Sequence, residues 1–297
     1  MTRGPVRSVT AVISLASLFA CTPVAGALGT GCEVVQPPTA LPDGLEETSG
    51  VAASRAHESI LWTHNDSGGE AEVVAVRANG ELVGRVAIRG ARAQDWEDLA
   101  LGACPEGTCL YLADIGDGTA RRAEVGVYRF AEPDPAGGAV RARYFPARYP
   151  TGPRDAEALF VLPGGEIHLV TKGRTEGVDL YRYPQSPTEG EPATLELVRR
   201  LAVGAQPLEA QVTGASASPS GEWVAIRSYK GLALWRTADL MREGGAPARL
   251  IDLEPLGEVQ GEAVALLDNG GVVLTSEGGF PGAMGSVVLA VCELDGD

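Results

Sequence analysis

Acidic side chains recur directly before apolar segments in this 297-residue chain. The motif QDWEDLA at 94–100 contains Asp95 and Glu97, RDAEAL at 154–159 contains Asp155 and Glu157, and VQGEAVAL at 259–266 contains Glu262. Carboxylates that converge on one place repel one another unless a cation, a basic side chain or protonation relieves them. An excess of oxygen ligands in a chain with 3 histidines suits a hard ion such as Ca²⁺ or Mg²⁺ better than zinc. If these acids meet, the sequence predicts a divalent-cation site.

The same positions belong to an internal repeat. Five segments align on a small or acidic residue before an apolar run, and these anchor residues are Ser49, Glu97, Glu157, Gly214 and Glu262. Each anchor is followed by a turn and a second apolar segment, then by a third segment and a looser fourth. Repeated groups of short segments, in a chain with 39 glycines and 20 prolines, are typical of the four-stranded blades of a β-propeller.

The two ends of the repeat predict how the ring closes. The fifth repeat has only three strands before the chain reaches Asp297, and CEVV at 32–35 supplies the missing outer strand. A ring closed in this way leaves no adhesive sheet edge. We therefore expect an all-β fold, a single five-bladed propeller over residues 32–297, in which Cys32 and Cys292 form a disulfide. A six-bladed propeller is the alternative, if 131–154 hides a further unit.

This fold brings the polar residues to one face, because the innermost strand of a blade begins where the second strand ends, beside the central channel. The predicted cation ligands are Asp66, Asp95, Glu97, Asp114, Asp117, Asp155, Glu157 and Glu262. The predicted ligand-binding residues around them are His64, Asn65, Trp96, Lys172, Arg227, Tyr229 and Glu277. A structural alternative is that the acids accept hydrogen bonds from backbone amides, or that Lys172, Arg174 and Arg227 neutralise them.

The N-terminal segment predicts export. Arg3 and Arg7 precede an apolar run at 9–20, which is too short to span a bilayer comfortably and fits a secretory signal over residues 1–20. The sequence LFAC at 18–21 resembles a lipobox, which implies a lipid on Cys21 and a tether over 21–31. The small residues AGA at 25–27 leave ordinary signal cleavage open.

The cysteines fit an oxidising compartment. Cys104 and Cys109 flank the turn-like sequence PEGT, which predicts a second disulfide beside Cys32–Cys292. This pairing leaves Cys21, of the 5 cysteines, for a lipid. We therefore expect a protein of the cell envelope, or a secreted one, that contacts a membrane only through its anchor.

The charge of the chain limits its partners. The formal net charge is −15 at pH 7, and it becomes more negative once Arg3 and Arg7 leave with the signal. Nucleic acid and anionic membrane surfaces are poor partners for such a field, whereas cations and cationic ligands are not. Solubility alone also accounts for an acidic surface.

Several motifs together resemble a known group. The segments ETSGVAAS, LWTHNDSGG, DWEDLA, LYLADIGDG, DAEALF, TKG and GEAVAL are similar to those of exported bacterial propeller proteins, which are distantly similar to propellers labelled esterase-like phytases. The resemblance covers nearly the whole mature chain and implies site roles for Glu97, Asp114 and Asp117. Where that group has an asparagine after DIGD, this chain has Gly118.

Three functions are compatible with the sequence. The first is a binding module that uses an acidic channel mouth to hold Ca²⁺ or Mg²⁺ and, through the ion, a small molecule or a protein. The second is a metal-dependent phosphatase or esterase-like hydrolase, with a metal-activated water near Asp66 and Asp114 and charge stabilisation by Lys172 or Arg227. The third is an architectural envelope protein. We favour the first, because the sequence identifies no pair of nucleophile and base.

Overall fold

The computed structural model describes residues 28, 31–67, 69–174, 177–201, 211–279 and 283–294. The predicted signal (1–20), the lipidation site Cys21 and most of the tether (21–31) lie outside the described residues. No helix in the described part of the chain combines the length and apolar character needed to cross a membrane.

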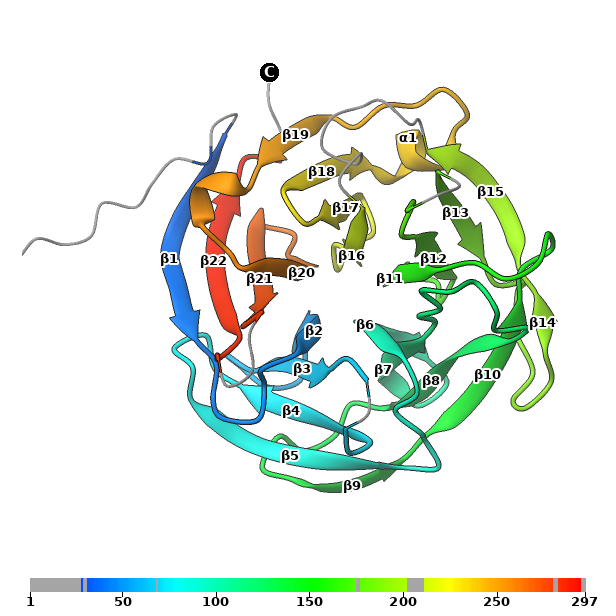
Figure 1. Ribbon diagram of the computed structural model, residues 1–297, viewed down its shortest axis with the longest axis horizontal. Coiled ribbons are helices and arrows are strands. Elements are labelled where there is room, and N and C mark those ends of the chain that lie inside the picture. Colours follow the sequence, from blue (N-terminus) through cyan, green and yellow to red (C-terminus); the bar gives the residue numbers. More distant parts are fainter. Residues whose placement is uncertain are drawn as a thin grey trace, which may run out of the picture.

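Five sheets, whose strands pair mainly antiparallel, stand around a central axis like the blades of a propeller (Figure 1). The predicted five-bladed propeller is confirmed. The six-bladed alternative is wrong, because 131–154 forms outer strands of existing sheets rather than a further blade. We number the blades 1 to 5 in chain order.

The blades are built from consecutive strands. Blade 1 contains β2 (Thr48–Ala53), β3 (Leu61–Asn65), β4 (Glu72–Val76) and β5 (Leu82–Arg89). Blade 2 contains β6 (Trp96–Cys104), β7 (Gly107–Asp114), β8 (Val125–Ala131) and β10 (Arg143–Arg148). Blade 3 contains β11 (Ala156–Val161), β12 (Ile167–Thr171), β13 (Val178–Arg182) and β15 (Glu196–Leu201).

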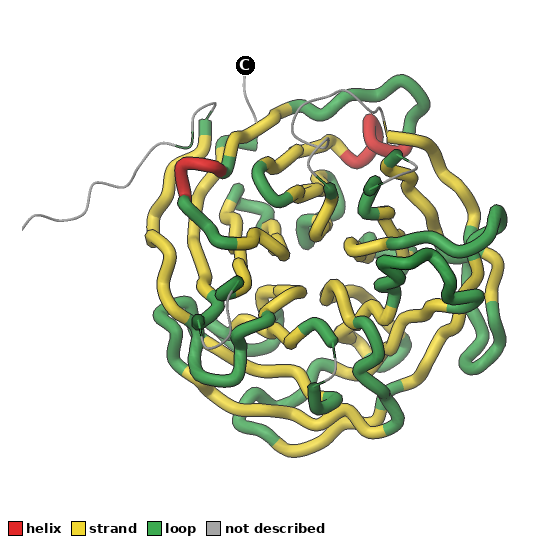
Figure 2. The backbone as a smooth tube through the Cα atoms, viewed as in Figure 1, coloured by secondary structure: helices red, strands yellow, loops and turns green. Residues whose placement is uncertain are grey.

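The last two blades complete the ring. Blade 4 contains β16 (Val212–Ala217), β17 (Trp223–Ser228), β18 (Gly231–Arg236) and β19 (Arg249–Asp252). Blade 5 contains β20 (Gln260–Leu266), β21 (Gly271–Glu277) and β22 (Ser286–Cys292), with β1 (Cys32–Ala40) on its outer edge. The two short helical segments described, α1 (Thr237–Met241) and the 3₁₀ turn η2 (Glu254–Leu256), lie in connections of the outer part of the ring (Figure 2).

The N-terminal strand closes the ring as predicted. β1 pairs antiparallel with β22, and Cys32 lies opposite Cys292. The two cysteines form a disulfide, so the first and last strands of the propeller are covalently joined.

Two further strands tie neighbouring blades together. β9 (Gly138–Arg141) lies between β8 and β10 in the chain but pairs in parallel with β5 of blade 1. β14 (Ala193–Thr194) precedes β15 of blade 3 but pairs in parallel with β10 of blade 2. Each added strand covers the outer edge of the preceding blade, which is one way in which proteins protect such edges.

The core lies between blades. Each of the five clusters of buried apolar residues is shared by two neighbouring blades. The inner strands are therefore enclosed on both faces, and all six residues of β11 (AEALFV) are buried. An outer strand such as β5 shows buried and exposed residues in alternation at its end, because one of its faces meets solvent. This enclosure positions the starts of the inner strands around the axis.

Candidate cation site at the channel mouth

A bulge near the start of every inner strand presents the anchor residues. The register between inner and second strand shifts at this point in all five blades, and a bulge re-aims the side chains beside it. The shifts fall at Ser49, Glu97, Glu157, Thr213 and Glu262. The fourth anchor is thus Thr213 rather than the predicted Gly214. The hydroxyl group of Thr213 donates to the Glu262 carbonyl oxygen (2.7 Å), as that of Ser49 does to the Glu97 carbonyl oxygen (2.5 Å).

Three carboxylates from blades 1 and 2 come together at this end of the channel. Asp66 follows β3, Asp95 precedes β6, and Glu97 lies in the β6 bulge. One oxygen atom from each side chain lies within 4.8 Å of the others. Glu97 is only 7% exposed, and Asp66 Oδ1 is buried without a hydrogen-bond partner. We call Asp66, Asp95 and Glu97 the carboxylate triad.

Lys172 supplies a positive charge beside the triad. Its Nζ atom lies 2.6 Å from Glu157 Oε1, and both side chains are buried. The same ammonium group lies 5.7 Å from the ring centre of Tyr229. Burial alone would lower the pKa of Lys172, but Glu157 raises it above its usual value. Lys172 is therefore charged, and Glu157 is its principal partner.

The remaining acids shift one another's pKa values upward. Burial, followed by the charges of Asp95, Glu157 and other acids, raises the pKa of Asp66 to about 7. Burial and the neighbouring charge of Glu157 also raise the pKa of Glu97 well above its ordinary value. A cation bound by these carboxylates would therefore compete with protons, in the case of Asp66 near neutral pH.

Blade 5 contributes a second acidic pair to the mouth. The side-chain amide of Gln260 donates to Glu262 Oε1 and to Glu277 Oε2, both at 2.8 Å. Burial, then the charge of Glu47, raises the pKa of Glu277 to about 7. Glu47 was not predicted as a site residue. Glu47 precedes anchor Ser49 in the sequence EETS. An acidic residue directly before the apolar run was the sequence signal that could have identified it as a site residue.

His64 and Asn65 lie on blade 1 beside the triad. His64 is fully buried, its Nδ1 atom donates to the Asn65 carbonyl oxygen (2.8 Å), and its Nε2 atom is buried without a partner. Burial lowers the pKa of His64 to about 4, so the ring is neutral. The Asn65 side chain donates to the Gly44 carbonyl oxygen (2.8 Å), while its Oδ1 atom has no partner. Several acceptor atoms here therefore lack a donor.

Trp96 and Arg227 serve the scaffold instead of the predicted ligand pocket. Trp96 is 1% exposed and belongs to the core between blades 1 and 2, where its ring meets His64 edge-on at 5.9 Å. Arg227 is completely buried, donates to the carbonyl oxygens of Ala263 (2.8 Å) and Thr275 (3.0 Å), and pairs with Glu258. The position of Arg227 at the end of a second strand correctly predicted that it lies at the face of the propeller that carries the mouth. Its side chain, however, points between blades 4 and 5 rather than into the mouth.

Asp114 and Asp117 lie beside the triad, but each is engaged by partners of its own. The guanidinium group of Arg122 pairs with Asp114 Oδ1 (2.8 Å), and the Arg122 backbone amide donates to Asp117 Oδ2 (2.6 Å). The Asp117 amide in turn donates to Asp155 Oδ1 (3.1 Å). These contacts hold the DIGD loop beside the triad. Of the predicted cation ligands, only Asp66, Asp95 and Glu97 form the compact group.

Asp98 is a buried residue that the sequence motif contained but that was not predicted as a site residue. It is 0% exposed, and its carboxylate accepts the backbone amides of Leu159 and Ala215 in blades 3 and 4 as well as its own neighbour Leu99. Burial raises the pKa of Asp98 although these amides favour its charged form. Asp98 therefore joins three blades directly beneath the mouth. Asp98 directly follows Glu97 in β6, and successive side chains of a strand point in opposite directions. This alternation was the only sequence signal that the two acids have different roles.

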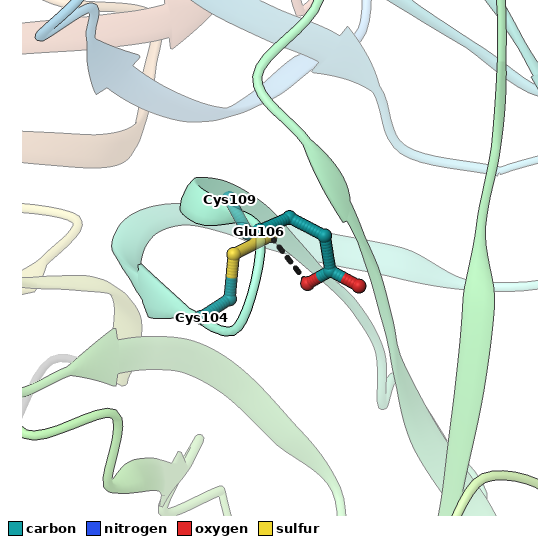
Figure 3. A group of neighbouring side chains, drawn as sticks. All are labelled: Cys104, Glu106 and Cys109. Carbon is teal, nitrogen blue, oxygen red and sulfur yellow. Dashed lines mark hydrogen bonds between the residues drawn. A yellow bond between two sulfur atoms is a disulfide. The ribbon is translucent and has the colours of Figure 1, made fainter.

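A second group of potential metal ligands is not a metal site. Cys104, Glu106 and Cys109 lie together, as Figure 3 shows, but the two cysteines form the predicted disulfide. The Glu106 Oε2 atom lies 3.8 Å from Cys109 Sγ, a polar contact only, because a disulfide sulfur carries no proton. Thiolate ligands are therefore not available here.

The chain matches no protein-family model and no curated protein sequence. Among solved structures it is similar to a PQQ-bound aldose sugar dehydrogenase from Streptomyces coelicolor, with a TM-score of 0.52 and 12% identity over 88% of this chain and 98% of that one. A gluconolactonase from Xanthomonas campestris follows with a TM-score of 0.47 and 12% identity over 92% and 99%. At this identity the first likeness supports the propeller fold alone. The finer resemblance to exported bacterial propellers stays a prediction.

Proposed function

We propose that the protein is a binding module whose channel mouth holds a divalent cation, with Asp66, Asp95 and Glu97 as ligands. The observation that carries this proposal is the approach of one oxygen from each carboxylate to within 4.8 Å of the others. Gathering partly buried acids costs free energy unless something compensates their charge. Lys172 and Arg122 offset this charge only in part: Lys172 pairs with Glu157 and Arg122 with Asp114, and burial remains the largest effect on the pKa values of Asp95 and Glu97.

Calcium fits the arrangement better than magnesium. Ca²⁺ accepts six to eight oxygen ligands in flexible geometry, whereas Mg²⁺ requires a near-regular octahedron. Asp66 and Asp95 lie in loops on either side of the channel edge and are only half-buried, so water or a ligand oxygen can complete the coordination. A small molecule or a protein segment bearing an oxyanion would then contact both the ion and the ammonium group of Lys172.

Calorimetric titration with CaCl₂ and MgCl₂ tests the proposal. We expect one Ca²⁺ per chain in the wild type, and a loss of at least about tenfold in affinity in Asp95→Asn and Glu97→Gln, since each removes a ligand charge. At a Ca²⁺ concentration of about 100 Kd the midpoint of thermal unfolding should rise by roughly 5–10 °C in the wild type.

The matched control is Glu222→Gln, which removes one negative charge from an exposed turn at the opposite end of the inner strands. It should bind Ca²⁺ like the wild type. Equal affinity in the wild type, Asp95→Asn and Glu97→Gln would show that the triad is not the site.

We further propose that the chain is exported and anchored through a lipid on Cys21. The pairing of all four described cysteines in two disulfides supports an oxidising compartment. Metabolic labelling with a fatty acid tests the anchor: label should appear in the wild type and be lost in Cys21→Ser. Equal labelling of both, or of neither, would exclude a lipid on Cys21.

A further inference from the structure

The central channel has a second opening with the opposite chemistry. The inner strands begin at the acidic mouth and end at a cavity of about 320 Å³. Four of the five inner strands, with the turns that follow them, supply most of the residues that line this cavity. Its walls include Val51, Leu99, Val161, Ala217 and Leu266, all of which are buried or nearly so. We call this space the apolar end of the channel.

Asp98 separates the two ends. Along β6 the order is Glu97 in the mouth, Asp98 in the middle and Leu99 at the cavity. The carboxylate of Asp98 reaches the amides of Leu159 and Ala215 across the axis at 2.8 and 3.0 Å. The Asp98 carboxylate and these amides therefore lie between the acids and the cavity, and they distinguish the apolar end from the acidic site.

One cationic group stands at the wall of this pocket. Arg55 lines the cavity, and its Nη2 atom donates to the Leu101 carbonyl oxygen at 3.4 Å. A guanidinium group has five N–H donors, and within the described ranges Arg55 takes part in no ion pair. Burial lowers the pKa of Arg55, and the negative charges of Asp268 and Glu132 oppose this effect.

Both of these acids have hydrogen-bond partners, although Glu132 Oε2 is buried without one. Glu132 Oε1 accepts from the Ser54 hydroxyl group (2.5 Å) and the Trp62 indole N–H (3.0 Å). Asp268 accepts from the Ser220 backbone amide (2.8 Å). Neither lines the cavity, so Arg55, whose side chain is exposed to solvent, is the ionised residue of the lining.

We propose that the apolar end of the channel binds a small monocarboxylate whose apolar body fills the cavity and whose carboxylate pairs with Arg55. The volume lies at the lower end of the range of small-molecule pockets, about 300–1,000 Å³, which selects a short ligand. Mainly apolar walls with one fixed charged group are the usual composition of such sites. Burying the apolar body of a ligand against these walls removes apolar surface from water, which favours binding.

Hexanoate is the probe, with 1-hexanol as its neutral counterpart, and ligand-observed NMR and calorimetry measure binding to the full mature chain. We expect saturable binding of hexanoate, and weakening by about fivefold or more in Arg55→Gln, in which a charge-assisted contact is lost. The same variant should bind 1-hexanol as the wild type does.

Two further variants test the cavity itself. Ala53 and Ala217 line it, so Ala53→Leu and Ala217→Leu should each abolish hexanoate binding, whereas Ala78→Leu, in a turn outside the cavity, should not. Retained Ca²⁺ binding at the acidic mouth, or an unchanged circular-dichroism spectrum, reports that a variant is folded. Hexanoate binding that survives both filling substitutions, that is not saturable, or that equals 1-hexanol binding in strength would overturn the proposal.

Discussion

Asp98 shows how one carboxylate can hold several blades. It accepts hydrogen bonds from backbone amides in blades 2, 3 and 4, and it is completely buried. Each of these amides belongs to the free edge of an inner strand, which has no neighbouring strand on the channel side. Asp98 therefore satisfies donors that a propeller axis would otherwise leave unpaired.

Replacing Asp98 by asparagine should destabilise the fold. The amide that replaces the carboxylate would turn its NH₂ group toward at least one backbone donor, so we expect the free energy of unfolding to fall by about 2–3 kcal/mol. Urea unfolding measures it. Glu222→Gln, on an exposed turn, should change stability by less than about 0.5 kcal/mol. A similarly small effect of Asp98→Asn would mean that the axis does not depend on this carboxylate.

Lys172 gives a prediction with two opposite readouts. In Lys172→Met, Glu157 loses its partner in a buried position, so the calcium-free protein should unfold at a lower temperature. The same change removes a positive charge beside the triad and frees a carboxylate, so Ca²⁺ affinity should rise by about threefold or more. Thermal unfolding and calorimetry measure the two effects. Unchanged Ca²⁺ affinity would place Lys172 outside the electrostatic reach of the ion, and a fall in affinity would contradict the prediction.

At the scale of elements, the repeat was readable because the same physical pattern occurs five times. A short apolar run, a turn and a second run identify the inner strands even where the anchors differ, from Ser49 to Glu262. Spacing alone could not distinguish Gly214 from Thr213, since a bulge shifts the register by a residue. The sequence also did not predict strands β9 and β14. Each pairs with a strand of the preceding blade, and the sequence around each strand does not indicate such a distant partner.

The site was predictable in its face but not in its details. The fold places Asp66, Asp95 and Glu97 together, as expected from strand order. Which of the predicted acids lack an ion-pair partner depends on the directions of their side chains and on basic residues such as Arg122. The sequence does not reveal either.

The closing element should contribute more stability than the small disulfide loop. Cys32–Cys292 spans a sequence separation of 260, whereas Cys104–Cys109 spans 5. In the loop-entropy account, replacing the first pair by serines should cost about 5–6 kcal/mol and replacing the second about 2 kcal/mol. Urea unfolding of the two double variants compares them. Equal losses would indicate that β1 stays paired with β22 without its covalent link.

At the scale of the whole molecule, the gathered acids make stability depend on pH. Asp66 and Glu277 have pKa values near 7 in the folded chain, against 3.8 and 4.5 ordinarily, mainly because they are buried. A carboxyl group whose pKa is raised by folding stabilises the fold at low pH and loses that contribution as pH rises through its folded value. His64 and His168 act oppositely, but only below their ordinary value of 6.5.

Above about pH 6.5 only the acids therefore matter. Between about pH 6.5 and 8.5 the calcium-free protein should lose at least roughly 2–4 °C in its unfolding midpoint, the shift that corresponds to 1 kcal/mol in a domain of this kind. Saturating Ca²⁺ should flatten this dependence, because the ion replaces the protons. Scanning calorimetry across the range measures it, and a midpoint that rises with pH in the absence of Ca²⁺ would contradict the assigned pKa directions.

The central claim is that a propeller mouth built by distant blades holds a divalent cation. Crystals grown with saturating CaCl₂ and measured for anomalous scattering test it most directly. The predicted result is one peak about 2.3–2.6 Å from carboxylate oxygens of Asp66, Asp95 and Glu97. A calcium peak elsewhere on the molecule, with the triad contacting only water, would contradict it.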